Sequence, residues 1–171
     1  MQTPSIVVRT RRPPVDRAAL ARAASALYAM SLPLAGRRGV APFDGGVDVI
    51  LVSPAASREA HMAVNGAAGA TDVITVPYAA TPLCPARAEL IVCPAVAVAE
   101  AAARDPSTLL AEERGRPWSA DLELALYLAH GFDHLAGSTD SSAAGYRAMR
   151  RRELRWLDAA FPEPPRFFRL A

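Results

Sequence analysis

The chain has 171 residues, of which 51% are hydrophobic and 21% are charged, and its formal net charge is only +2. Such high apolar content with so little net charge excludes intrinsic disorder as the main state, and two cysteines are too few for a disulfide scaffold. The apolar runs at residues 90–99 and 122–129 fall well short of the roughly 18 residues of a membrane-spanning helix. We therefore expect one domain over residues 1–171 and no membrane span.

The N-terminal segment and the cysteine usage indicate a cytoplasmic protein. Residues 1–12 lack the basic-then-apolar order of a signal peptide. Cys84 and Cys93 lie outside any CxxC spacing, and we interpret them as reduced thiols. All 19 basic residues are arginine, a bias that is typical of a GC-rich genome but also suits bidentate phosphate contacts. The composition thus permits an acidic partner such as RNA without requiring one.

The first predicted elements are a strand and a helix. Residues 5–9 contain the β-branched run Ile6-Val7-Val8 and predict a short strand. Asp16 can cap a helix over residues 17–30, which are rich in alanine and leucine. The glycines and prolines of residues 33–46 predict a loop.

A second strand and helix follow this loop. Residues 47–52 predict a strand, and Ser53 followed by proline is a helix start, so we expect a helix over residues 55–64. The Asn65-Gly66 pair ends that helix, because glycine readily adopts the left-handed conformation at a helix C-terminus.

Two adjacent strands and a helix come next. The alternating, β-branched residues 71–77 and the apolar residues 88–93 predict strands, and the loop between them contains two prolines. Pro94 begins a helix that continues to about residue 103.

The last third of the chain predicts two helices. After a connector at residues 106–117, Ser119 caps a helix that runs to residue 135 and that Gly137 ends. Ser141 or Ser142 begins a final helix that reaches about residue 160. The order is β-α-β-α-β-β-α-α-α, which predicts an α/β (α+β) fold with one small sheet of about four strands packed by about five helices.

The spacing of two histidines predicts a metal site. His130 and His134 are four residues apart on a predicted helix, so both imidazoles leave the same face. Gly137 allows the chain to turn back, which brings Asp140 toward the same point. Two imidazoles and one carboxylate would form an open three-ligand site for zinc or another divalent metal, with the fourth position left for a water molecule that becomes a nucleophile at neutral pH.

The same segment resembles a family signature. Residues 130–140 read H-G-F-D-H-L-A-G-S-T-D, which is similar to the signature H-G-x-L-H-L-x-G-Y-D-H of the YbeY family of bacterial rRNA maturation factors. Asp140 stands where the family has its third zinc-binding histidine. Residues 71–77 and 89–93 resemble the family's two adjacent strands, and Met149 and Glu153 stand at the family's downstream positions. The resemblance covers about residues 47–160.

The resemblance implies a function. YbeY proteins are single-strand-specific, metal-dependent endoribonucleases that act in 16S rRNA maturation and ribosome biogenesis. For this chain it implies one zinc ion, a water molecule that attacks a phosphodiester, and partners among single-stranded RNA, ribosomal RNA or the small ribosomal subunit. It implies neither a nucleotide cofactor nor a membrane partner.

Departures from the family concern the candidate catalytic residues. Asn65 stands where the family has an arginine that serves catalysis, and an amide brings no charge to a phosphate. Arg58 or Arg87 could supply that charge instead. Asp133 replaces the inner leucine of the signature, and it could orient His130, act as a general base, or be an exposed helix carboxylate.

Further candidates lie on the last helix and before the loop that joins the two adjacent strands. Glu153 falls within the apolar stripe of its helix, so it must be paired either with a ligand histidine or with a buried arginine. Arg147 and Arg151 lie on the opposite face, flanked by Arg150 and Arg152, and form either a solvated face or a stripe that contacts RNA phosphates. Tyr78 is the best-placed aromatic residue for stacking on a base.

Three functions remain open from the sequence. The first is the metal-dependent endoribonuclease, and the second is a catalytically degenerate, metal-binding factor for ribosome assembly or RNA binding. A zinc peptidase is the least favoured, because the peptidase motif has glutamate directly after the first histidine and this chain has Gly131 there.

Overall fold

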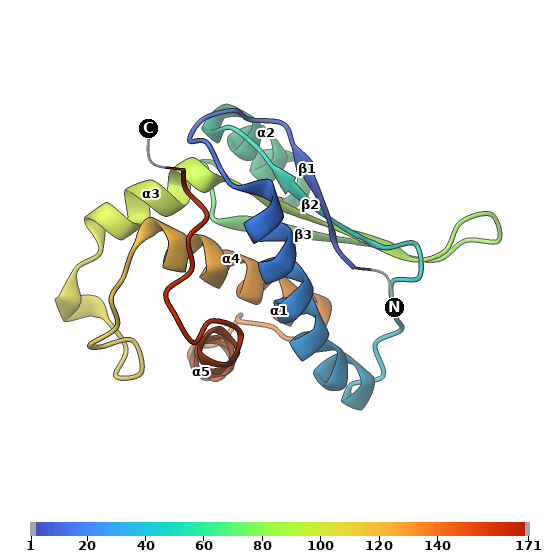
Figure 1. Ribbon diagram of the computed structural model, residues 1–171. Coiled ribbons are helices and arrows are strands. Elements are labelled where there is room, and N and C mark those ends of the chain that lie inside the picture. Colours follow the sequence, from blue (N-terminus) through green and yellow to red (C-terminus); the bar gives the residue numbers. More distant parts are fainter. Residues whose placement is uncertain (1–2, 170–171) are drawn as a thin grey trace.

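The computed structural model describes residues 3–169, and the order of its elements matches the order predicted from the sequence (Figure 1). In chain order the elements are β1 (Ser5–Val8), α1 (Arg17–Arg37), β2 (Val47–Leu51), α2 (Pro54–Asn65), β3 (Val73–Tyr78), β4 (Arg87–Val92), α3 (Pro94–Ala103), a short 3-10 helix (Pro106–Thr108), α4 (Ala120–Leu135) and α5 (Ala143–Ala160). Four strands form one mixed sheet and five α-helices pack around it, so the predicted α+β fold is confirmed.

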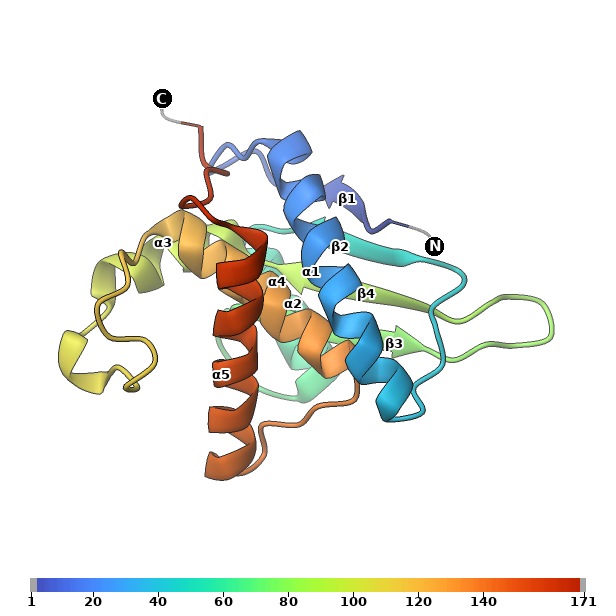
Figure 2. The same cartoon turned by 60° about the horizontal axis from the view of Figure 1, so that its bottom comes forward.

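The strands are arranged in the order β1-β2-β4-β3. β1 pairs parallel with β2, β2 pairs parallel with β4, and β3 pairs antiparallel with β4. β3 therefore forms one edge of the sheet. The β3–β4 connection extends away from the helices (Figure 2).

The two faces of the sheet are covered differently. On one face, α1 and α4 pack against the strands over the main hydrophobic core, and α5 lies against α4 (Figure 2). On the other face, α2 packs over a smaller cluster formed by Ile50, Val52 and Cys93. α4 is thus enclosed by the sheet, α1, α3 and α5, and twelve of its residues are buried.

Gly131 allows α4 to approach the sheet closely. A Cβ atom at this position would lie 2.6 Å from Cδ2 of Leu90 in β4 and 3.2 Å from Cγ2 of Val73 in β3. These separations are shorter than ordinary van der Waals contact, so any larger residue would force the Leu90 side chain or the helix to shift. The close approach brings the neighbouring His130 to the edge of the sheet that β3 forms.

α1 is longer than the sequence predicts. It continues to Arg37, through Pro33, so the expected helix end at residue 30 and loop start at residue 33 are wrong. Proline lacks an N–H and disfavours a helix interior by about 3 kcal/mol, but burial of the next residue, Leu34, recovers about 1.5–3 kcal/mol. Packing against the core therefore offsets the local cost.

The extension of α1 also makes this helix long enough to be compared with a membrane-spanning helix. Within residues 3–169, α1 is the one helix long and apolar enough to span a membrane by length and composition. The expectation of no membrane span rests on uninterrupted apolar runs and so does not consider α1, whose apolar residues are interrupted by Arg22. Seven residues of α1 are buried, and its contacts with α4, α5 and β1 make it a helix of the protein core.

Candidate metal centre

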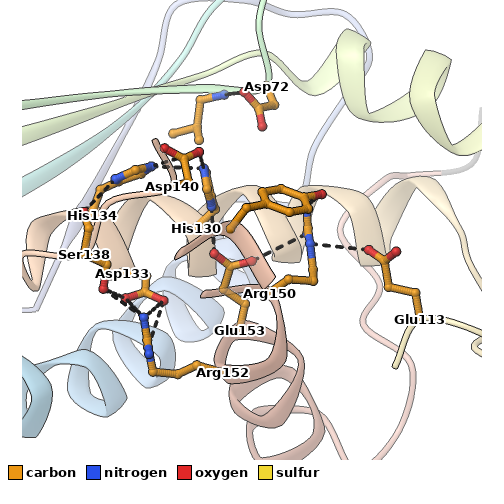
Figure 3. A network of polar contacts seen from close by, with 12 residues as sticks. Asp72, Glu113, His130, Asp133, His134, Ser138, Asp140, Arg150, Arg152 and Glu153 are labelled. Atoms are coloured by element: carbon orange, nitrogen blue, oxygen red, sulfur yellow. Dashed lines mark hydrogen bonds and ion pairs between the residues drawn. The ribbon is translucent and has the colours of Figure 1, made fainter. Parts of the chain in front are cut away.

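The C-terminal end of α4 brings together the three side chains that the sequence predicts as metal ligands (Figure 3). The Nε2 atoms of His130 and His134 lie 3.1 Å apart. After α4, Gly137 adopts a positive φ of 81° and the chain turns back toward the helix. Oδ2 of Asp140 then lies 3.6 Å from Nε2 of His130 and 3.9 Å from Nε2 of His134. The expected convergence is confirmed.

The separations of the three donor atoms fit a metal ion. With bonds of about 2.0–2.1 Å, neighbouring ligand atoms of a tetrahedral site lie about 3.3 Å apart. The observed separations of 3.1, 3.6 and 3.9 Å bracket this value. This group could therefore hold a metal ion, and the mixed nitrogen and oxygen donor set accepts zinc as well as other divalent metals.

Hydrogen bonds to the other ring nitrogens orient both imidazoles. Nδ1 of His130 lies 2.7 Å from Oε1 of Glu153, and Nδ1 of His134 lies 3.1 Å from the carbonyl oxygen of Ser138. A carboxylate and a carbonyl only accept, so both Nδ1 atoms donate their protons. In neutral rings the two Nε2 atoms then carry lone pairs that face each other across 3.1 Å. A cation between them, shared with Asp140, removes this repulsion.

The surroundings of His130 raise the pKa of its imidazole. Burial opposes protonation, but the hydrogen bond from Nδ1 to Glu153 and the negative charges of Glu153 and Asp72 outweigh it and raise the pKa of His130. The same negative charges favour a bound metal cation. Glu153 therefore lies where the sequence predicted, against a ligand histidine, and it also contacts Arg150 at 3.5 Å.

Asp133 does not lie where the sequence predicted. It is completely buried, and its carboxylate accepts hydrogen bonds from Arg152 at 2.9 and 2.8 Å and from the hydroxyl of Ser138. It points away from the metal ligands (Figure 3). The expected roles in orienting His130 or as a general base are wrong, because Arg152 neutralises the carboxylate inside the protein and Glu153 orients the ring instead. The alternative of an exposed helix carboxylate is also wrong.

The ion pair of Asp133 and Arg152 holds the loop that carries the third ligand. Ser138 receives hydrogen bonds from Arg152 and Arg38 at its hydroxyl oxygen, and its backbone N–H donates to the carbonyl of Asp133. The Ser138 carbonyl in turn accepts from His134. Together these contacts fix the turn that places Asp140 beside the two histidines.

The three donors open into a cleft of about 600 Å³, which the first strand residues of β3 and Asn65 also line. Asn65 is thus placed at the cleft, as expected. Arg58 is exposed on α2 and is not among the lining residues. Its expected position near the site is therefore wrong, because Arg58 lies about two turns before Asn65, the residue at the end of α2 that reaches the cleft.

Tyr78 and Arg87 lie together at the base of the β3–β4 hairpin. The guanidinium of Arg87 lies 4.4 Å from the centroid of the Tyr78 ring, and both side chains contact Glu89. Both residues are exposed, and neither lines the cleft. The expectation that Arg87 could supply positive charge at the site is therefore wrong, because it lies at the hairpin base. Arg87 covers one face of the Tyr78 ring. Stacking of an RNA base on the opposite face of the ring stays a prediction, as does contact of Arg87 with RNA.

The arginines of α5 divide into two groups. Arg147 and Arg151 are exposed, as expected for that face, and Arg151 lies 3.6 Å from Glu112. Arg150 and Arg152, expected to flank the solvated face, instead turn inward. Both arginines form ion pairs with buried carboxylates. Glu113 and Glu153 contact Arg150, and Asp133 contacts Arg152.

One carboxylate of the cleft was not singled out from the sequence. Asp72 precedes β3 and lines the cleft beside His130. Its Oδ1 accepts hydrogen bonds of 2.8 Å from the Val73 backbone and of 2.8 Å from the Thr71 hydroxyl. The signal was present, because Asp72 is a carboxylate at the start of the strand predicted over residues 71–77.

No protein-family model and no curated protein matches this chain. Among solved structures, the chain is similar to the solution structure of TM1509 from Thermotoga maritima. The two share 21% sequence identity with a TM-score of 0.50, and the match covers 91% of this chain and 90% of the other. At this identity the likeness supports the fold alone.

Proposed function

We propose that the protein is a metal-dependent endoribonuclease of the YbeY kind, which cleaves single-stranded RNA during 16S rRNA maturation. One observation carries the proposal. The Nε2 atoms of His130 and His134 lie 3.1 Å apart, the Asp140 carboxylate lies beside them, and all three side chains line a cleft of about 600 Å³. This arrangement occurs in the segment that resembles the YbeY signature. An open cleft beside three metal ligands suits hydrolysis better than a closed structural site.

The residues of the cleft can each serve hydrolysis of a phosphodiester. A divalent ion held by His130, His134 and Asp140 would supply a Lewis acid and an acidified water molecule. Glu153 keeps the ring of His130 oriented toward the ion. Asp72 lies in the cleft and forms no buried ion pair, so it can accept a proton. The amide of Asn65 can donate a hydrogen bond to a phosphate oxygen.

A second candidate is a metal-binding factor for ribosome assembly or RNA binding that has lost catalysis. Among the described residues 3–169, no arginine lines the cleft. The transition state of phosphodiester hydrolysis accumulates negative charge, and cationic side chains usually stabilise it. Asn65 and Asp140, in place of the family's arginine and histidine, both reduce positive charge at this point.

Metal analysis is the first test of the proposal. We expect protein purified without chelator to hold about one divalent ion per chain, as a three-ligand site requires. His134→Ala and Asp140→Ala should lose most of this metal. His61→Ala is a matched control, because His61 lies outside the ligand group and contacts the carbonyl of Gly69. Unchanged metal content in His134→Ala would refute the site.

Cleavage of labelled RNA separates the two candidates. The metal-loaded protein should cut single-stranded RNA and leave the matched duplex intact, and Asp140→Ala should not cut. Metal-loaded protein that cuts neither substrate would refute the nuclease. Activity that appears only in the double variant Asn65→Arg/Asp140→His would then support the non-catalytic candidate.

A further inference from the structure

A second cavity of about 520 Å³ adjoins the metal cleft. We call it the distal cavity; it lies between α3, the connector after α3, α4 and α5. Thr71, Asp72 and His130 line both the distal cavity and the cleft. A ligand held at the metal ligands can therefore extend into the distal cavity, whose volume falls within the range of about 300–1,000 Å³ that small-molecule sites occupy.

The distal cavity contains buried hydrogen-bonding groups that lack partners. Tyr127 is only 5% exposed, and its hydroxyl has no hydrogen-bond partner. Burial, together with the charges of Glu123 and Asp72, raises the pKa of Tyr127, so the hydroxyl keeps its proton and can donate it. Nε and Nη1 of Arg150 also lack hydrogen bonds, although they lie 3.3 Å from Glu113 and 3.5 Å from Glu153. A buried hydroxyl without a partner favours a ligand that supplies an acceptor.

The charge of the distal cavity limits what can bind there. Its acidic lining residues are Asp72, Glu100, Asp105, Glu113 and Glu123, and its basic lining residues are Arg104 and Arg150. Carboxylates thus outnumber guanidiniums, and Arg104 and Arg150 are already engaged by the buried Glu113 and Glu123. A phosphate group would be repelled. A neutral group with N–H donors would be favoured, because carboxylates only accept hydrogen bonds.

An aromatic side chain stands beside these groups. Tyr146 of α5 lines the distal cavity and is 38% exposed. Its hydroxyl accepts a hydrogen bond of 3.1 Å from Arg150, which ties the ring to the wall of the cavity. A partly exposed, anchored ring provides a surface on which a flat ligand can stack.

We propose that the distal cavity binds one nucleobase of the RNA whose phosphodiester lies at the metal ligands, and that it prefers guanine to uracil. The inference rests on the proposed function. Guanine offers N–H donors on its Watson–Crick edge for the carboxylates, and the acceptors O6 and N7 for the Tyr127 hydroxyl. Uracil offers a single N–H donor. Bases of single-stranded RNA are recognised in this way, by stacking and by hydrogen bonds to their edges.

Direct binding of nucleosides tests the inference without RNA cleavage. Saturation-transfer NMR with metal-loaded protein should show that guanosine binds about tenfold more tightly than uridine, as one additional good hydrogen bond allows. Tyr127→Phe should weaken guanosine binding by about fivefold to tenfold, and Tyr146→Ala by about tenfold through loss of stacking. Tyr28→Phe is the matched control, because Tyr28 is buried elsewhere against Phe132. Circular dichroism of each variant serves as the control for folding.

Each outcome bears on the inference separately from the proposed function. Guanosine binding by a protein that does not cleave RNA would support the distal cavity and refute the nuclease. RNA cleavage without guanosine binding would support the nuclease and overturn the inference about the distal cavity. Equal binding of guanosine and uridine, or guanosine binding unchanged in both Tyr127→Phe and Tyr146→Ala, would overturn the inference. Binding of spermidine in place of guanosine would also overturn it and indicate a site for cations.

Discussion

The substitution Arg152→Met tests the role of the buried ion pair behind the metal loop. It leaves the carboxylate of Asp133, which is 0% exposed, without its cation. Breaking a buried ion pair from one side costs about 3–5 kcal/mol. The Arg152 side chain is 18% exposed and Ser138 still donates to Asp133, so we expect the lower end of this range, about 3 kcal/mol.

This loss can be measured by urea unfolding and by thermal melting followed with circular dichroism. For a chain of this length, each kcal/mol shifts Tm by about 2–4 °C, so Arg152→Met should lower Tm by about 6–12 °C. The opposite single variant, Asp133→Leu, should cost less. In Asp133→Leu the residue left without a partner is Arg152, whose guanidinium lies on a flexible side chain and can turn toward water. The short side chain of Asp133 cannot reach water in Arg152→Met.

The double variant Asp133→Leu/Arg152→Met removes both charges. Replacing a buried ion pair by apolar residues is often neutral or stabilising, so we expect its stability to return to within about 1 kcal/mol of the original protein. The metal affinity should fall in Arg152→Met, because the ion pair holds the loop that carries Asp140. An Arg152→Met protein as stable as the original, or a double variant no more stable than Arg152→Met, would refute this reasoning.

Three further substitutions test other parts of the structure. Glu153→Gln should weaken metal binding by about 10–100-fold, because it removes the charged acceptor of His130; competition with a chromophoric chelator measures this, and unchanged affinity would count against the orienting role. Gly131→Ala should lower the free energy of unfolding by about 1–3 kcal/mol in urea, because the added Cβ would lie 2.6 Å from Cδ2 of Leu90. A variant as stable as the original protein would show that the helix can shift. Ser142→Ala should cost about 1 kcal/mol by the same measurement, because it removes the cap of α5, and a loss under about 0.3 kcal/mol would mean that the cap is dispensable.

Features that depend on neighbouring residues were predictable from the sequence. Asp16, Ser53 and Ser119 cap the helices they were expected to begin, because a cap needs only a side-chain oxygen and a backbone N–H three residues later. His130 and His134 share one helix face for the same reason, since four residues make about one turn.

Errors arose where distant parts of the chain meet. Local pattern does not predict the end of α1, because burial of Leu34 outweighs the local effect of Pro33. It does not predict the role of Asp133, because the partner residue Arg152 lies nineteen residues away on another helix. Which arginines of α5 face inward depends on how α5 rotates against α4, and helical periodicity alone does not reveal where buried carboxylates of other elements will lie.

The sequence by itself determined the strands, the helix starts, and the residues that could bind a metal, because each follows from contacts within a few positions. Only the tertiary structure decided the strand order, the ion pair that holds the metal loop, and the distal cavity beside His130. These depend on side chains brought together by packing, whose separation in the chain has no fixed relation to their separation in space.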